Sequence, residues 1–177
     1  MLLRIDDLPA GFRAGQVPQP DRATEEAATK VRTCNPHLRP DEPHVPRAAS
    51  PRFIDPTGRN IESFVDVNRS EAEAHEDVAA AHDASLMRCV VRVVYRPLST
   101  EEPVLRRIPV ESLGDEATGW RLILVPKDTG RRLYMDQITV RVGDLEALLV
   151  FRADNDPFTT AEERHLARLV VRRAPAG

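Results

Sequence analysis

This sequence of 177 residues has two cysteines, Cys34 and Cys89, whose thiols could form a disulfide or stay reduced. They lie far apart in the chain, so they do not form the C-x-x-C pair of a zinc site or a dithiol enzyme. By themselves they fit either two buried thiols in a cytoplasmic protein or one disulfide in an exported protein. The residues alone leave this choice open.

Two histidines, His75 and His82, occupy one side of a predicted helix. They are two turns apart, which is about 10 Å along the axis and too far for one metal ion. We therefore expect them at the polar edge of the packed face. His82, Asp83 and Ser85 are the residue types of a hydrolytic triad, but adjacency in sequence does not make a triad.

Further chemical signals are weak. Asp154, Asn155 and Asp156 offer oxygen ligands without the glycine and the distant glutamate of a calcium loop, so we expect a turn there. The sequence has no G-x-S-x-G, H-E-x-x-H or glycine-rich phosphate loop. We predict no catalytic residue, no metal and no cofactor.

Three residues are candidates for binding a ligand: Trp120, Tyr134 and Arg92. Trp120 and Tyr134 flank a predicted central hairpin in a chain with few aromatic residues, although core packing would also explain them. Arg92 lies on the outer face of a predicted strand. Together they define the predicted ligand-binding residues.

Composition excludes two classes of function. The hydrophobic fraction is 41% and the charged fraction 30%, and no apolar run approaches the roughly 18 residues of a membrane span. The net charge is -3, and 23 of the 25 basic residues are arginine. Because these arginines are scattered among 28 acids, they do not form the basic patch of a nucleic-acid-binding protein. We expect no membrane span and no nucleic-acid partner.

The elements that must position these residues begin with a proline-rich arm, residues 1–51. Nine of the 15 prolines precede residue 57. The arm starts with a segment expected to pack on the core through apolar side chains, and it contains a short helix over 23–34 that points Cys34 inward. The apolar side chains are Leu2, Leu3, Ile5, Leu8 and Phe12.

The predicted core covers residues 52–173. It starts with a hairpin over 52–67 that turns at 55–58, followed by a helix from a Ser70-x-x-Glu73 capping box to about residue 86. After Cys89 the apolar pattern changes to a period of two, which predicts a strand over 91–96. Further strands are predicted over 104–110, 120–125, 133–142 and 145–151, with a tight turn at Gly143-Asp144.

A capped helix over 159–173 and a frayed tail, 174–177, end the predicted single domain of residues 1–177. Short turns require antiparallel strands. The predicted fold is α+β: a curved, mostly antiparallel sheet of about six strands with two main helices on one face. The other face would be partly exposed or form a groove that holds a ligand.

Several short motifs occur in a familiar order: "LLRIDDLPAGF", "RTCNP", a capped helix ending in "RCV", "IPVESLGDEATGW" and "ITVRVGDLEALLVF". In this order the chain resembles the extracytoplasmic sensor-type domains of actinobacterial lipoproteins and receptor-like serine/threonine kinases. The resemblance covers nearly the whole chain and implies a twisted antiparallel sheet with a cleft, export, no catalytic residues, and a disulfide between Cys34 and Cys89.

Two features depart from that pattern. The kinase sensor domains usually carry a second disulfide, and exported members begin with a signal peptide or anchor. Here "MLL" followed by Arg4 and Asp6 is too short for the apolar core of a signal peptide. We therefore keep a cytoplasmic location as the alternative to an extracytoplasmic one.

These observations lead to three hypotheses. The first is a non-catalytic, extracytoplasmic sensor-like or ligand-binding domain of the cell envelope, whose partner is an unknown small molecule or an envelope protein. The second is an interaction module that uses the open sheet face or an edge strand. The third is a small hydrolase with a dispersed site, for example His75, Asp115 and Tyr134. A concave pocket would favour the first hypothesis, and a flat apolar patch the second.

Overall fold

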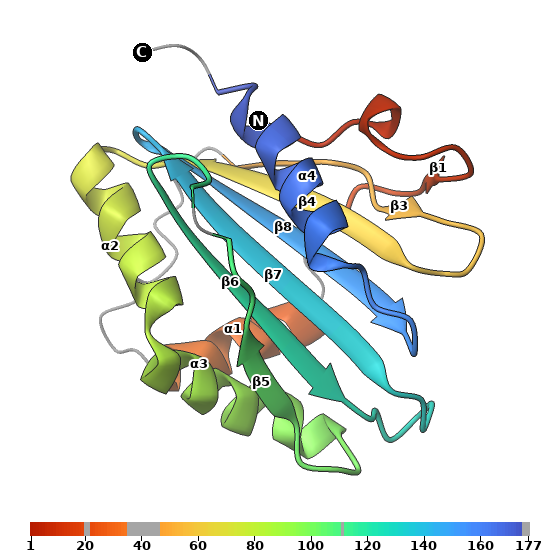
Figure 1. Cartoon of the computed structure of the whole chain (residues 1–177). Helices are drawn as coiled ribbons and strands as arrows, with labels where there is room; N and C mark the ends of the chain where they lie inside the picture. Colours follow the sequence, from red (N-terminus) through yellow and green to blue (C-terminus); the bar gives the residue numbers. More distant parts are fainter. Residues whose placement is uncertain (20–21, 35–46, 111, 175–177) are drawn as a thin grey trace.

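The computed structural model describes residues 1–19, 22–34, 47–110 and 112–174. Residues 35–46 of the predicted arm and residues 175–177 of the predicted tail lie outside the described residues. The described chain is α+β, with eight strands in one open sheet and four α-helices (Figure 1).

The strands are β1 (Arg13–Ala14), β2 (Arg47–Ala49), β3 (Phe53–Ile54), β4 (Asn60–Val67), β5 (Val104–Arg107), β6 (Glu116–Leu124), β7 (Leu133–Val142) and β8 (Leu145–Asp154). The helices are α1 (Arg22–Cys34), α2 (Glu71–His82), α3 (Ala84–Val90) and α4 (Thr160–Val171). Short helical turns are η1 (Ile5–Asp7), η2 (Val91–Tyr95) and η3 (Arg96–Leu98).

The sheet order is β1-β3-β4-β8-β7-β6-β5, with β2 also pairing with β4, and every pairing is antiparallel. The segment from α2 to η3 carries the chain from β4 to the far edge of the sheet. Strands β5 to β8 then return as a meander, so the last strand pairs with β4. This crossover places a helical layer over the sheet.

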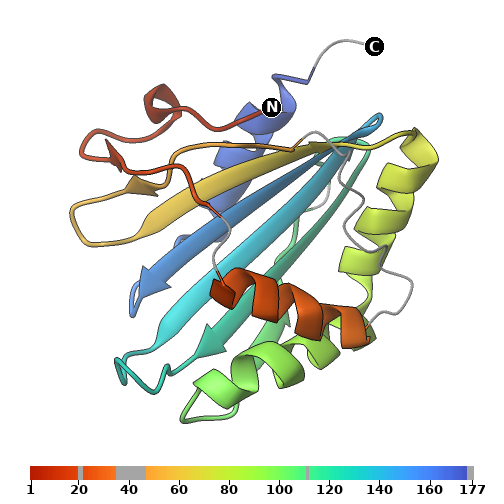
Figure 2. The ribbon, with the colours of Figure 1, turned by 180° about the vertical axis from the view of Figure 1, so that it is seen from behind.

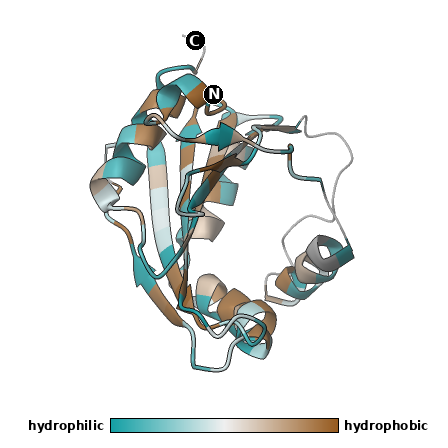
Figure 3. Cartoon of the chain, turned by 90° about the vertical axis from the view of Figure 1, so that its right-hand side faces the viewer, coloured by the Kyte–Doolittle hydropathy of each residue, from teal (hydrophilic) through white to brown (hydrophobic). Residues whose placement is uncertain are grey.

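Helices cover both faces of the sheet. Trp120 and Arg121 are neighbours in β6, so their side chains point to opposite faces. The Trp120 indole Nε1 donates to the carbonyl oxygen of Ala81 in α2, whereas the Arg121 guanidinium donates to the carbonyl oxygen of Phe158 before α4. We call these the cleft face and the α4 face. Seen from the side, α4 and α1 lie on opposite sides of the sheet (Figure 3).

The α4 face carries the larger apolar core. Alternate residues of β4, β7 and β8 are fully buried there against α4 and the N-terminal segment, and Phe151 and Phe158 meet edge to face with ring centroids 5.4 Å apart. Leu3 and Leu8 reach this core as predicted, but Ile5 is 40% exposed, contrary to the prediction. The α4 face therefore forms the main hydrophobic core of the described chain.

Several predicted elements are confirmed. The hairpin turns at Asp55, whose carboxylate accepts from the backbone N–H groups of Thr57 and Arg59, and Gly58 has a φ of +92°. Gly143 supplies the positive φ of the β7–β8 turn. The Thr159 hydroxyl and the Glu162 carboxylate form a reciprocal capping box at α4.

The predicted strand over 91–96 is wrong. Residues 84–98 are helical throughout as α3, η2 and η3, so Cys89 lies within a helix and not at a junction with a strand. Val91 and Val94 are both buried against the sheet, a spacing that suits a helix. A valine-rich run of five residues fits both the period of two of a strand and the 3.6-residue period of a helix. Here the packing of this run against the sheet favours the helix.

Other expectations on helices also need correction. The two main helices, α2 and α4, lie on opposite faces and not on one, and the described sheet has eight strands rather than about six. The predicted helix over 70–86 is split at Asp83, which ends α2 and caps α3 by accepting from the Ser85 N–H at 2.7 Å. Ser70 caps α2 as predicted, but the Glu73 carboxylate accepts from the backbone N–H of Arg69 rather than that of Ser70.

Candidate ligand-binding cleft

A cleft of about 560 Å³ lies between the cleft face of the sheet and the helical layer. Its floor is formed by alternate residues of β6 and β7, namely Trp120, Leu122, Met135 and Gln137. Its walls come mainly from apolar residues of α2, α3 and η2, namely Ala80, Ala81, Leu86, Met87, Val90 and Val91. The cleft is therefore apolar over most of its surface.

Trp120 is fixed firmly in the floor. Its Nε1 donates to the Ala81 carbonyl oxygen at 2.8 Å, which ties α2 to β6. The Arg107 guanidinium lies 3.8 Å from the ring centroid and also donates to the Thr118 hydroxyl at 2.7 Å. These contacts satisfy the indole N–H and place a guanidinium over a face of the ring, so the indole is held in one orientation.

Helix α1 closes one side of the cleft. The predicted disulfide is confirmed: Cys34 at the end of α1 is bonded to Cys89 in α3, with the two Cα atoms 5.7 Å apart. Helix α1 packs against α3 and η2, and Val31 lines the cleft. Viewed from behind, α1 crosses in front of the strands beside α3 (Figure 2).

One end of the cleft is acidic. Asp66 of β4 and Glu146 of β8 are directly paired residues of neighbouring strands, and Asp77 of α2 lines the same end. Burial, followed by repulsion from Asp77 and Asp66, raises the pKa of Glu146 to about 7. Burial also raises the pKa of Asp66, against the attraction of Arg47, whose Nε lies 3.5 Å from the Asp66 carboxylate.

The other end carries Tyr95. Its hydroxyl contacts the Met135 sulfur at 3.6 Å, and burial raises its pKa. Along β7, Met135 is six residues from Arg141, which is paired with Glu146, so the cleft runs for about 20 Å from the tyrosine to the carboxylates. It has the shape and polarity to hold an elongated molecule with one polar end.

The structure separates the three residues predicted to bind a ligand. Trp120 lines the cleft. Tyr134 lies on the α4 face, with the Arg121 guanidinium 5.9 Å from its ring centroid. Arg92 is exposed on η2, where its guanidinium contacts the Cys89 sulfur at 3.8 Å. Their ligand-binding role stays a prediction, for which the geometry supports Trp120 alone.

Sequence reasoning missed the acidic end and Tyr95. Asp66 and Glu146 are far apart in the chain, and only the register of β4 with β8 brings them together. The alternating pattern after Cys89 predicts a strand for Tyr95, whereas the structure places this residue in the helical turn η2, next to Met135. A signal for the carboxylates existed, since Asp66 and Glu146 are each acidic residues inside strands with apolar neighbours.

The residues of the hydrolase hypothesis do not assemble into one site. The His75 Nδ1 lies 2.8 Å from the Glu116 carboxylate, and Arg141 joins Glu116 to Asp115, so His75 and Asp115 share one end of the sheet. Tyr134 is seven residues from Arg141 along β7, about 24 Å away, and on the opposite face. The enzyme hypothesis itself stays untested.

The remaining polar candidates have structural partners. The carbonyl oxygen and the ring Nδ1 of His82 both contact Arg107. Asn155 has a φ of +60° and, with its two aspartate neighbours, forms the turn between β8 and α4. Within the described residues, no group of three or more histidine, cysteine, aspartate or glutamate side chains is arranged to hold a metal ion.

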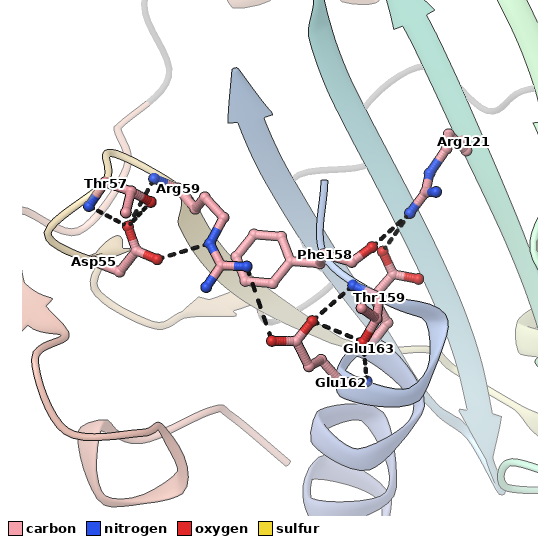
Figure 4. Close-up of polar contacts among 8 residues, drawn as sticks. All are labelled: Asp55, Thr57, Arg59, Arg121, Phe158, Thr159, Glu162 and Glu163. Atoms are coloured by element: carbon pink, nitrogen blue, oxygen red, sulfur yellow. Dashed lines mark hydrogen bonds and ion pairs between the residues drawn. The ribbon is translucent and has the colours of Figure 1, made fainter. Parts of the chain in front are cut away.

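A second, more polar groove of about 480 Å³ lies between the N-terminal segment and α4. Figure 4 shows its central contacts: the Arg59 guanidinium lies over the Phe158 ring, 4.6 Å from the centroid, and pairs with Asp55 at 2.7 Å and with Glu162 at 3.9 Å. The cation that borders this groove is thus already paired with two carboxylates. The cleft under α1 to α3 is the better candidate site.

The fold and the cleft define a class: an α+β protein with an open antiparallel sheet and an apolar cleft, acidic at one end, between the sheet and a helical layer. Comparison with known proteins adds no family to this class, because no family model and no curated protein matches the chain. The resemblance to sensor-type domains therefore stays a prediction. No helix among the described residues is both long and apolar enough to cross a membrane.

Proposed function

We propose that this chain is a non-catalytic, sensor-like domain that binds a small apolar molecule in the cleft between its sheet and helices α1 to α3. The cleft itself carries the proposal. Its volume of about 560 Å³ falls within the range of about 300–1,000 Å³ typical of small-molecule sites. Its apolar walls and few polar groups are also typical of such sites.

The disulfide supports a location outside the cytoplasm for this function. Cys34 and Cys89 are bonded to each other, and structural disulfides persist in oxidising compartments. The resemblance to extracytoplasmic sensor-type domains points to the same compartment. We therefore propose an exported ligand-binding domain of the cell envelope.

The cleft favours ligand binding over the interaction-module hypothesis. That hypothesis offered an open sheet face or an edge strand. The open face is not available among the described residues, because α4 covers one face and α1 to α3 lie over the other, so only an edge strand remains for it. A concave site between two layers is typical of small-molecule binding, whereas protein partners usually bind flatter surfaces.

The test uses Trp120, the single tryptophan of the chain, as a reporter inside the cleft. N-phenyl-1-naphthylamine, a neutral apolar dye, is titrated into the protein while energy transfer from Trp120 to the dye is recorded. Ala80→Phe places a bulky side chain in the cleft, and Ala79→Phe places the same side chain on the exposed side of α2. We expect Ala80→Phe to weaken dye binding at least tenfold and Ala79→Phe to leave it within about twofold of wild type.

Two outcomes would contradict the proposed function. The dye could fail to bind the folded wild-type protein with energy transfer from Trp120. Alternatively, Ala79→Phe and Ala80→Phe could weaken binding equally, which would place the dye outside the cleft. Circular dichroism of both variants establishes that they are folded.

A further inference from the structure

We propose that the molecule bound in this cleft is a neutral, largely apolar compound with a carbonyl oxygen, and that this oxygen accepts a hydrogen bond from the Tyr95 hydroxyl. This inference rests on the proposed function and adds the chemical class of the ligand. It follows from the hydrogen-bond partners of the polar side chains that line the cleft.

Within the described chain, the Tyr95 hydroxyl has no strong acceptor. Its hydrogen-bond partner is the Met135 sulfur, at 3.6 Å, and a thioether sulfur is a weak acceptor. Burial raises the pKa of this hydroxyl, so the group is desolvated and protonated at neutral pH. A desolvated hydroxyl without a strong acceptor costs free energy, and a ligand oxygen beside it would remove that cost.

Tyr95 lies where a bound molecule can contact it. Its side chain lines the cleft together with Met135, and it packs against the apolar cluster of Val91, Leu122 and Leu124. In such apolar surroundings a hydrogen bond is stronger than it is in water. An acceptor bound at this end of the cleft would therefore form a favourable hydrogen bond with the phenol.

The other polar groups of the cleft select a ligand less clearly. The Trp120 indole Nε1 already donates to the Ala81 carbonyl oxygen at 2.8 Å. The Asp66 carboxylate lies 3.5 Å from the Arg47 Nε. The Gln137 amide can donate as well as accept, so it does not favour one kind of ligand group. The phenol is therefore the group that calls for an acceptor oxygen.

The charges of the cleft indicate that the ligand is neutral. Among the described residues that line the cleft, none is basic, and the carboxylates lie at the end opposite Tyr95. A carboxylate ligand would lose its hydration without gaining an ion pair, which is costly in an apolar site. A ketone or ester carbonyl is an acceptor without a charge, and it can form part of an otherwise apolar skeleton.

The experiment compares three competitors that each contain eleven carbon atoms: pentylbenzene, 1-phenylpentan-1-one and 5-phenylpentanoate. The first two differ only in the exchange of one methylene group for a carbonyl group. Each is used at pH 7.5 to displace N-phenyl-1-naphthylamine from the protein. We expect both neutral compounds to displace the dye from the wild-type protein and 5-phenylpentanoate to be the weakest of the three.

Tyr95→Phe tests the hydroxyl directly, because it keeps the aromatic ring. We expect this variant to bind 1-phenylpentan-1-one about five- to tenfold more weakly and to keep its affinity for pentylbenzene within about twofold of wild type. Tyr134→Phe is the matched control. It removes the hydroxyl of the other tyrosine of the chain, on the α4 face, and should leave both affinities within about twofold of wild type.

Met135→Leu gives a change of the opposite sign. It removes the competing sulfur acceptor at similar side-chain volume, so 1-phenylpentan-1-one should bind more tightly relative to pentylbenzene. Thermal denaturation establishes that each variant is folded.

The outcomes separate this inference from the proposed function. If the dye binds in the cleft but Tyr95→Phe weakens both neutral competitors equally, or 5-phenylpentanoate binds most tightly, the carbonyl proposal is wrong and the ligand-binding function stands. Equal losses of 1-phenylpentan-1-one binding in Tyr95→Phe and Tyr134→Phe would also overturn it. If the dye does not bind, the proposed function fails first and this inference fails with it.

Discussion

Glu163 shows how burial controls a single carboxyl group in this protein. Its side chain is fully buried at the start of α4 beside Asp136, which is 1% exposed. The Arg121 guanidinium donates to both Asp136 oxygens, at 2.8 and 2.7 Å, and to Glu163 at 3.2 Å. Burial and the nearby Asp136 raise the pKa of Glu163 to about 9, so Glu163 is neutral at pH 7 and Asp136 pairs with the arginine.

This pKa gives a prediction for Glu163→Gln. Between pH 4.5 and about 9 the folded protein keeps a proton on Glu163 that the unfolded chain has lost, so this group lowers the free energy of unfolding as pH rises. We expect Glu163→Gln to raise the free energy of unfolding at pH 8 by about 1–3 kcal/mol and to have little effect at pH 4. Urea denaturation at both pH values measures this difference.

The matched control is Glu101→Gln, an exposed position where the same change should leave the pH dependence unaltered. A loss of stability in Glu163→Gln at both pH values would show instead that Glu163 is ionised and contributes through its pairing with Arg121.

Gly114 shows a second constraint at the scale of one residue. It has a φ of +58°, and a Cβ atom there would overlap the Arg141 carbonyl oxygen and lie 2.7 Å from the Val140 side chain. The next residue, Asp115, donates its N–H to that same carbonyl at 2.9 Å. The loop therefore approaches β7 too closely for any side chain at position 114.

Gly114→Ala should lower the free energy of unfolding by about 3 kcal/mol or more, and Gly130→Ala by about 1 kcal/mol. Gly130 has a similar φ of +63° but no atom within 4 Å of the added Cβ. Because the backbone strain is comparable, the difference between the two variants in chemical denaturation isolates the steric overlap. Equal losses would mean that the loop can move away from β7.

At the scale of elements, the helical segment from α2 to η3 determines the shape of the cleft. Asp83 divides it into two helices, and the turn between them directs α2 along the sheet and α3 toward β5. The disulfide then holds α1 on this layer through Cys34 and Cys89. The shape of the cleft therefore depends on α1, which the disulfide joins to α3 in the wall of the cleft.

Removal of the disulfide should lower both stability and ligand affinity. A bond that closes 55 residues restricts the unfolded chain by about 4 kcal/mol in the loop-entropy description. We expect Cys34→Ser/Cys89→Ser to lower the free energy of unfolding, measured by urea denaturation, by about 2–4 kcal/mol. The variant should also bind N-phenyl-1-naphthylamine several-fold more weakly, because Val31 would leave the cleft. Reduced wild-type protein is the matched control and should behave like the variant.

The disulfide would not be needed to hold α1 at the cleft if the free energy of unfolding of Cys34→Ser/Cys89→Ser were within about 0.5 kcal/mol of wild type and its dye affinity were unchanged. It would mean that the contacts of α1 with α3 and η2 hold the helix without the bond.

At the scale of the whole molecule, the two faces of one sheet have different uses. The α4 face is filled by a continuous apolar core that also packs the N-terminal segment. The Arg173 guanidinium, just beyond α4, pairs with Asp7 and donates to the Leu2 carbonyl oxygen at 3.0 Å, which joins the two ends of the chain. The cleft face carries a smaller apolar cluster near β5 and β6, around Val91, Leu122 and Leu124, and the cleft opens beside this cluster.

Local sequence signals predicted much of this architecture. Alternating apolar residues located the four long strands, and turn residues such as Gly58 and Gly143 gave their antiparallel connections. Capping residues located the starts of α2 and α4. These features depend on neighbours within a few residues, so they can be recognised without knowledge of the fold.

Tertiary structure decided the rest. The valine-rich run after Cys89 fits a strand or a helix by sequence, and packing against β6 made it helical. Trp120 and Tyr134 lie on different faces because strand register, which no local pattern fixes, assigns each residue its side. The same register brings Asp66 to Glu146 and so creates the acidic end of the cleft. The sequence by itself determined the elements and their order, whereas only long-range pairing and packing determined which residues share the site.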